Sequence, residues 1–185
     1  MDLRFDDDKG EDCLLSFDCT DLEIVEPSPY NRKVSKRWYS HKFKGPGLRY
    51  EIAIVISTGL IAWVNGPFPC GLFPDSKTFR EEGLMKALPK GERVEADGGY
   101  KSLDPMYCKT PYGLTSKIKP ERSKLSNRVR ARQETINKRM KQFGILNHVY
   151  RHDINDHMSV FHAVAVLTQL EMINGQPLFE INNYE

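Results

Sequence analysis

The sequence lacks the features that mark a secreted, disulfide-bonded or membrane-spanning protein. Only four cysteines occur in its 185 residues, and none of them forms a CxxC pair. The first dozen residues are acidic rather than apolar, so we expect no signal peptide and predict free, packing thiols in a reducing compartment. The longest apolar runs, IAIVI and AVAVL, are far too short to span a membrane.

The motifs of several common enzyme classes are missing as well. The chain contains no GxSxG, no HExxH and no P-loop. His148 and His152 are four residues apart, as are Asp153 and His157, but the turn-forming segment RHDIND interrupts these pairs. This interruption disfavours a histidine metal site.

The net charge of the chain is small, at +2, but the charged residues are unevenly distributed along it. Residues 1–30 hold ten acids against two bases, whereas residues 117–141 hold ten bases against Glu121 and Glu134. A solvated helix is one interpretation of the basic segment, and a polyanion-binding surface is the other. If it binds nucleic acid, our candidates for contacts with the DNA backbone are Arg128, Arg132 and Lys138.

The hydrophobic pattern predicts an α/β fold with a mixed sheet and helices packed on it. CLLSFDCT, RYEIAIVIS and LIAWVNG have the character of strands, and Thr58-Gly59 links the last two as a hairpin. A helix capped by Asp75 or Ser76 and ended by Pro89 precedes a further strand, ERVEAD, which implies a crossover onto the same sheet. Two more helices are predicted over residues 121–143 and 155–174. We expect a flexible arm at 1–12, one domain at 13–175 and a tail at 176–185.

Three carboxylates occupy positions from which they could meet at one edge of this sheet. Asp18 lies in the first strand, Asp97 ends the strand ERVEAD, and Glu134 lies in the long basic helix. Carboxylate oxygens on rigid elements are the ligands that Mg²⁺ and Mn²⁺ prefer, and two such ions about 4 Å apart can clamp a phosphodiester. The glycines that follow Asp97 would leave clearance for the phosphate.

Each of these carboxylates also has a purely structural interpretation. Asp18 could be a capping or turn residue, and its neighbour Asp21 is an equally acidic candidate. Asp97 could only form a turn, and Glu134 could pair with Lys138 four residues later on the helix surface. Asp75 is expected to cap a helix rather than to assist the site.

Three blocks carry these acids in order: FDCTDLEIVEPSP, VEADGGYKSLDPMYCKTPY and NRVRARQETINKRMKQFGIL. Together with the closing helix FHAVAVLTQL, they resemble the DDE-superfamily endonucleases, the transposase nuclease domains related to the Harbinger group of eukaryotic transposons. The resemblance extends from about Cys13 to Leu170. It departs from the pattern at Cys19, where relatives usually have glycine, and at Asp21, where a histidine often stands.

The resemblance implies a ribonuclease H-like fold and DNA cleavage with strand transfer. It also implies two divalent ions, Mg²⁺ or Mn²⁺, held by Asp18, Asp97 and Glu134, descent from a transposable element and a nuclear location. The chain begins almost at the first catalytic strand, with no helix-turn-helix domain before it. We therefore expect DNA recognition to come from a partner protein or a missing exon, or to be lost. The alternatives are an inactive, domesticated remnant that binds DNA or a protein, and a metal-dependent phosphodiesterase acting on RNA or small substrates.

Overall fold

The computed structural model describes residues 13–27, 36–103, 106–110 and 120–181, so the predicted arm at 1–12 lies outside the described residues. Its centre is a mixed six-stranded sheet in the order β2-β3-β1-β5-β6, with β4 paired to the other part of β3. The strands are β1 (Cys13–Glu23), β2 (Tyr39–Ser40), β3 (Gly45–Val55), β4 (Ile61–Pro69), β5 (Arg93–Glu95) and β6 (Cys108–Lys109).

Strand direction divides the sheet into two halves around β1. On one side β1 pairs antiparallel with β3, and β3 pairs antiparallel with β4 through the predicted hairpin, in which Gly59 has a φ of 78°. On the other side β5 is parallel to β1 and β6 is parallel to β5. The predicted α/β fold with a mixed sheet is therefore confirmed, and it is a ribonuclease H-like arrangement.

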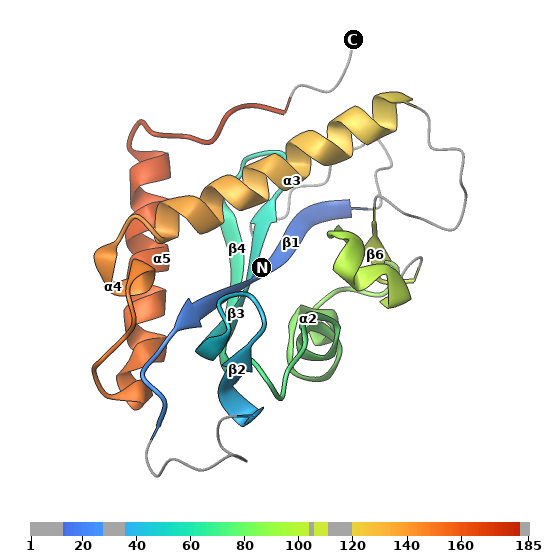
Figure 1. Cartoon of the computed structure of the whole chain (residues 1–185). Coiled ribbons are helices and arrows are strands. Elements are labelled where there is room, and N and C mark those ends of the chain that lie inside the picture. Colours follow the sequence, from blue (N-terminus) through green and yellow to red (C-terminus); the bar gives the residue numbers. More distant parts are fainter. Residues whose placement is uncertain (1–12, 28–35, 104–105, 111–119, 182–185) are drawn as a thin grey trace.

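Helices cover both faces of the sheet because side chains alternate along β1 and β3. Figure 1 shows α3 (Pro120–Met140) crossing over β1 and α5 (His157–Ile173) standing to the left, joined through α4 (Gly144–Asn147). These helices and one strand face enclose a core that includes Tyr50, Ile52, Ile136, Met140 and Phe161. No helix within the described residues combines the length and the apolar character needed to cross a membrane.

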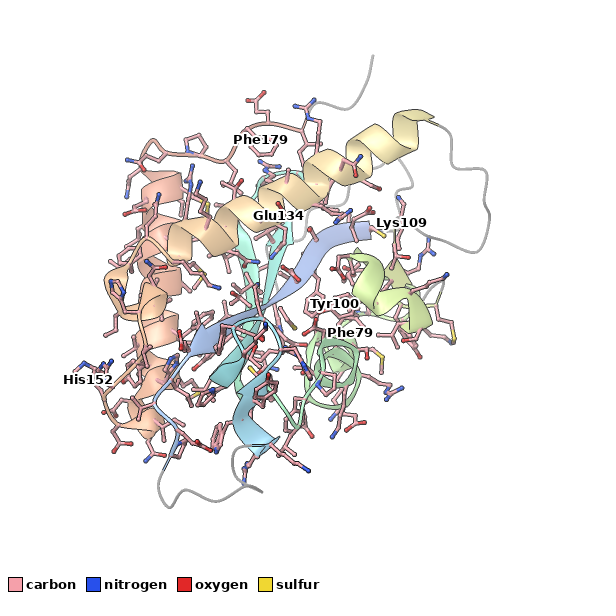
Figure 2. The ribbon with its side chains drawn as sticks, viewed as in Figure 1. Phe79, Tyr100, Lys109, Glu134, His152 and Phe179 are labelled. Carbon is pink, nitrogen blue, oxygen red and sulfur yellow. The ribbon has the colours of Figure 1, made fainter. Side chains whose placement is uncertain are left out.

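The opposite face of the sheet packs against short helical turns rather than one regular helix. These turns are α2 (Asp75–Lys77), a π-helical turn at Thr78–Glu82 and 3-10 turns at Leu84–Lys86 and Gly98–Leu103. The aromatic residues Phe17, Phe79 and Tyr100 meet there, with ring centroids of Phe17 4.9 and 5.2 Å from the other two (Figure 2). All four cysteines are buried and free, as predicted.

The single helix predicted from Asp75 to Pro89 was wrong, because Gly83 interrupts it. The backbone of Gly83 lies directly against the carboxylate of Glu51, and a Cβ at this position would come 1.9 Å from Glu51 Oε1. Glu51 is fully buried and accepts hydrogen bonds from Trp63 Nε1 and Asn65 Nδ2. The chain therefore bends around a buried polar group that no local sequence pattern announces.

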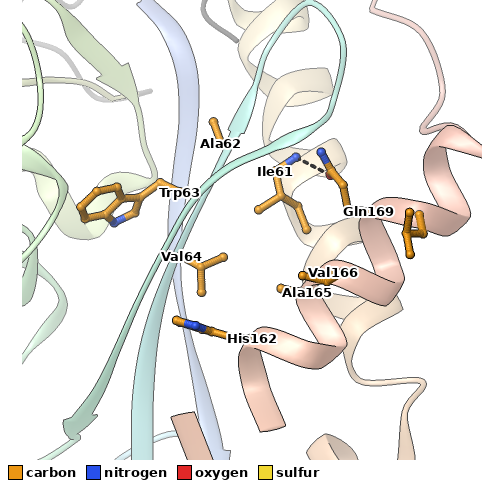
Figure 3. A pocket seen from close by; sticks show the side chains of 9 residues that line it. Ile61, Ala62, Trp63, Val64, His162, Ala165, Val166 and Gln169 are labelled. Carbon is orange, nitrogen blue, oxygen red and sulfur yellow. Dashed lines mark hydrogen bonds between the residues drawn. The ribbon is translucent and has the colours of Figure 1, made fainter. Parts of the chain in front are cut away.

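Helix α5 packs against β4, and an apolar cavity of about 340 Å³ remains between them (Figure 3). The backbone N–H of Ile61 donates to Gln169 Oε1 at 2.9 Å across this gap. The side chain of Gln169 thus satisfies a backbone donor at the start of β4.

The buried imidazole of His157 predicts an acid-sensitive fold. Its Nδ1 lies 2.8 Å from Tyr50 Oη, its ring meets Tyr150, and burial lowers its pKa to about 4. The unfolded chain takes up this proton near pH 6.5, so the stability contributed by neutral His157 is lost as the pH falls from 6.5 towards 4. We expect a loss of about 3 kcal/mol from this residue.

Urea unfolding at pH 7, 5.5 and 4.5 will measure this loss. His157→Gln should flatten the dependence over this interval, whereas His152→Gln, at an exposed position, should leave it unchanged. An equal pH dependence in His157→Gln and wild type would contradict the assignment.

Candidate active site

Strand pairing and helix packing bring Asp18, Asp97 and Glu134 around one small cavity. Ser16 of β1 pairs with Glu95 of β5 in a parallel register, so two residues further along Asp18 and Asp97 are neighbours. Helix α3 crosses β1 and carries Glu134 over the same point (Figure 2). The cavity has a volume of about 60 Å³ and is lined by Ser16, Phe17, Asp18, Asp97, Arg130, Gln133 and Glu134.

Asp18 is the most constrained of the three carboxylates. Its Oδ1 accepts a hydrogen bond from the N–H of Cys19 at 2.8 Å, and its Oδ2 accepts one from Asn137 Nδ2 at 2.9 Å. Burial raises the pKa of Asp18 to about 7, and the charge of Asp97 contributes in the same direction. The side chain is therefore held in one orientation, in surroundings that resist its ionisation.

Asp97 is exposed at the end of β5 and does form a turn. Its Oδ1 accepts a hydrogen bond from the N–H of Gly99 at 2.7 Å, and its carbonyl accepts one from Tyr100. A Cβ on Gly99 would lie 2.9 Å from the same Oδ1, so the space at Gly99 is taken by the carboxylate of Asp97 itself. Gly99 therefore leaves room for the carboxylate of Asp97, and the clearance for a phosphate stays a prediction.

Glu134 lines the cavity from an exposed position on α3. Neither Glu134 nor Lys138 has an ion pair among the residues that the structure describes, so the expected surface pair is not formed. Nor do any three His, Cys, Asp or Glu side chains in the described part of the chain lie close enough to hold a metal ion together. The three acids surround one space without converging on a single point.

The chemistry of this donor set nevertheless fits a divalent cation. Three carboxylates face a cavity that has room for an ion, and hard anionic oxygens are the ligands that Mg²⁺ and Mn²⁺ take. Burial is the main cause of the raised pKa of Asp18, and the charge of Lys42 opposes it. Asp18, Asp97 and Glu134 are thus the residues that could hold such an ion.

A second, polar cavity of about 470 Å³ adjoins the first, since Asp18 and Asp97 line both. Its wall contains a network centred on Arg49, which contacts Asp21 through Nε and Nη2 at 2.7 and 2.9 Å and Asp75 through Nη1 at 2.7 Å. Burial acts in the opposite direction, but hydrogen bonds from Arg49 and Ser40 lower the pKa of Asp21. Asp21 is therefore an ionised structural partner of Arg49.

Asp75 does not have its predicted capping role. It is the first residue of α2, no side-chain hydrogen bond caps that helix, and its carboxylate contacts Arg49 instead. With a side chain that is 43 % exposed, Asp75 faces the same cavity as Asp18 and Asp97. Burial and the neighbouring acids raise its pKa, although Arg49 opposes this.

The three predicted DNA contacts on α3 have different environments. Arg132 is 2 % exposed and donates from Nη1 to the carbonyl of Ile56 at 2.7 Å, so it anchors the β3–β4 hairpin and cannot contact DNA in this conformation. Arg128 is exposed but donates to the carbonyl of Glu180 at 2.7 Å. Lys138 is exposed at the helix surface.

The sequence interpretation missed Asn137 and Arg49. Asn137 follows Glu134 by three residues, a spacing that places both on one side of a helix, and this signal was available. Arg49 lies opposite Asp21 in the β1–β3 register, which the sequence alone does not define.

The environment of Asp18 generates a testable prediction. The pKa of Asp18 lies near 7 in the fold and near 3.8 in the unfolded chain, so its ionisation destabilises the fold as the pH rises through this interval. Asp18→Asn should therefore stabilise the protein at pH 8 by about 4 kcal/mol, and the gain should shrink as the pH falls towards 3.8. Thermal unfolding measures it, with the exposed Asp156→Asn as control. A less stable Asp18→Asn at pH 8 would contradict the assignment.

Comparison with known proteins gives one match. Residues 17–169 match the family described as DDE superfamily endonuclease, and this span contains Asp18, Asp97 and Glu134. Searches of curated proteins and of solved structures return no match. Because the match covers most of the chain, the protein belongs to the DDE superfamily endonucleases.

Proposed function

We propose that this protein is a divalent-metal-dependent DNA endonuclease of the transposase type. Asp18, Asp97 and Glu134 are its metal-binding and catalytic residues, and its reaction is phosphodiester cleavage with strand transfer. The observation that carries the proposal is that the three acids line one cavity in a chain of this family. Descent from a DNA transposon and action in the nucleus belong to the same proposal, as does a separate protein that recognises the DNA sequence.

The three carboxylates of the site differ in how firmly hydrogen bonds fix their side chains. Asp18 is fixed by Cys19 and Asn137, and Asp97 is fixed by Gly99, so both carboxylates are oriented before any ligand binds. Glu134 lines the cavity but has no such hydrogen bond in the described structure, so its exposed side chain can change rotamer on α3. This favours closure of the site by Glu134 upon two preset aspartates.

When bound, Mg²⁺ or Mn²⁺ would supply positive charge that favours ionisation of the attacking hydroxyl and stabilises the leaving oxygen. The chain's own contribution is orientation and access. The 470 Å³ cavity beside Asp18 and Asp97 offers space for a DNA strand next to the carboxylates. Arg128 and Lys138 on α3 remain proposed contacts with the DNA backbone.

A second function has one observation in its favour. No three metal-ligating side chains within the described ranges share a point, and Glu134 is exposed, as expected of a domesticated module that binds DNA or protein without cutting. Metal binding separates the two functions, because only the enzyme needs the carboxylates to share an ion.

The nuclease proposal predicts metal-dependent nicking of supercoiled DNA that Asp97→Asn abolishes. Asparagine keeps the size and the hydrogen bond to Gly99 but removes the charge, so we expect at least a roughly 100-fold loss of rate. Asp156→Asn, an exposed carboxylate outside both cavities, should nick at the wild-type rate. Equal rates for Asp97→Asn and wild type would refute the proposal, and cleavage of RNA but not DNA would reassign the substrate.

Calorimetry with Mn²⁺ tests the site without requiring turnover. Wild type should bind Mn²⁺, and Glu134→Gln should weaken binding at least roughly tenfold without loss of stability, since Glu134 is exposed. Glu171→Gln, another exposed glutamate on a helix, is the matched control. If wild type shows no Mn²⁺ binding that depends on Glu134, the non-cutting module is the correct function.

A further inference from the structure

We propose that the β2–β3 turn, residues 39–44, binds the phosphates of the DNA strand that enters the active site. This inference rests on the proposed function and adds a DNA-binding element that lies away from the basic helix α3. Its cations are Lys42 and Lys44, and its ligand is the sugar–phosphate backbone of DNA.

The turn belongs to a one-sidedly basic segment of the chain. Residues 36–50 contain no Asp or Glu, and their cations are Lys36, Arg37, Lys42, Lys44 and Arg49. All of these except Arg49 are exposed, and Arg49 is occupied by Asp21 and Asp75. Lys42 and Lys44 are thus surface cations in a sequence segment without Asp or Glu, and Lys42 shares its cavity with Asp18, Asp21, Asp75 and Asp97. Exposed cations of this kind can contact a polyanion such as a DNA backbone.

The position of the turn connects this charge to the active site. Tyr39, His41 and Lys42 line the 470 Å³ cavity whose other wall includes Asp18 and Asp97. A phosphate held by Lys42 would therefore lie beside the two aspartates, in the cavity through which we propose that the strand reaches them.

The turn is anchored to the sheet and does not need binding to order it. Ser40 Oγ donates to Asp21 Oδ2 at 2.6 Å and accepts a hydrogen bond from the N–H of Lys42. The ring of Phe43 lies over Gly47, where a Cβ would come within 2.4 Å of it. These contacts place Lys42 in advance, which lowers the entropic cost of holding a phosphate.

The backbone of the turn gives a second, independent observation. Lys44 has a φ of 57°, the only positive φ that the described residues show at a position other than glycine. Glycine would adopt this conformation without strain, so the fold alone would favour glycine at this position. A lysine in this strained conformation, two residues after the cavity-lining Lys42, points to a function for its side chain.

The three residues of α3 that were predicted to contact DNA are less well placed for this task. Arg132 is buried and Arg128 is engaged by the carbonyl of Glu180, while Lys138 lines neither cavity. Lys42 is the exposed lysine that lines the cavity shared with Asp18 and Asp97. Lys42 thus adds a cation on the side of the larger cavity, whereas Arg130 of α3 lines the smaller one.

Fluorescence anisotropy with a labelled DNA duplex over a range of KCl concentrations tests this inference. All proteins carry Asp97→Asn, so that Mg²⁺ can be present while cleavage is suppressed. Adding Lys42→Ala and Lys44→Gly should weaken binding at least roughly tenfold and reduce the salt slope by about 2. Lys86→Ala with Lys90→Ala removes the same charge from exposed positions outside the cavity and should have little effect.

Lys44→Gly also separates binding from folding. Glycine adopts a positive φ without strain, so the melting temperature of the Lys44→Gly variant should equal or exceed that of the parent protein while its DNA binding weakens. Unchanged affinity and salt slope in the Lys42–Lys44 variant would overturn the inference, as would an equal loss in the Lys86–Lys90 control or a loss confined to Arg128→Ala with Lys138→Ala.

The two proposals fail in different ways. If wild type nicks DNA with metal but the Lys42–Lys44 variant binds DNA normally, the proposal for the turn is rejected and the nuclease proposal stands. If that variant binds DNA more weakly but wild type does not nick DNA, the turn is a DNA-binding element and the nuclease proposal is rejected. A parent protein that does not bind the duplex would overturn both.

Discussion

The burial of a carboxylate in the central strand is the constraint on which the site depends. Asp18 lies in β1, which is hydrogen-bonded on both sides, and burial raises its pKa to about 7. A fold gains no stability from ionising a desolvated acid, and carboxyl groups with a pKa shifted in this way are common at functional sites. The hydrogen bonds from Cys19 and Asn137 orient this carboxylate, and the parallel neighbour β5 sets Asp97 beside it.

The alternation of side chains along β1 separates two tasks within a few residues. Asp18 shares its face with α3, where Asn137 contacts it and Glu134 lines the same cavity. Asp21 engages Arg49, and that network ties together β1, β3 and the start of α2. The larger cavity lies between this network and the candidate catalytic residues Asp18 and Asp97. The ion pairs of Arg49 thus form part of the wall of the space in which a DNA strand would be held.

Much of this architecture could be predicted from the chain, because periodic apolar segments and the Thr58-Gly59 turn are local signals. The positions of Asp18, Asp97 and Glu134 in order also favoured one family, which the match over residues 17–169 supports. What failed was set by tertiary contacts. Gly83 breaks a helix because it meets the buried Glu51, Asp75 leaves its expected cap for Arg49, and Arg132 turns inwards to the carbonyl of Ile56.

Anomalous diffraction from crystals grown with Mn²⁺ tests the central claim most directly. We expect manganese density in the cavity lined by Asp18, Asp97 and Glu134, with Glu134 turned from the surface of α3 towards the ion. Crystals of the Asp18→Asn variant grown under the same conditions should lack this density. Manganese bound elsewhere, or Glu134 pointing to solvent with the two aspartates unliganded, would contradict the account.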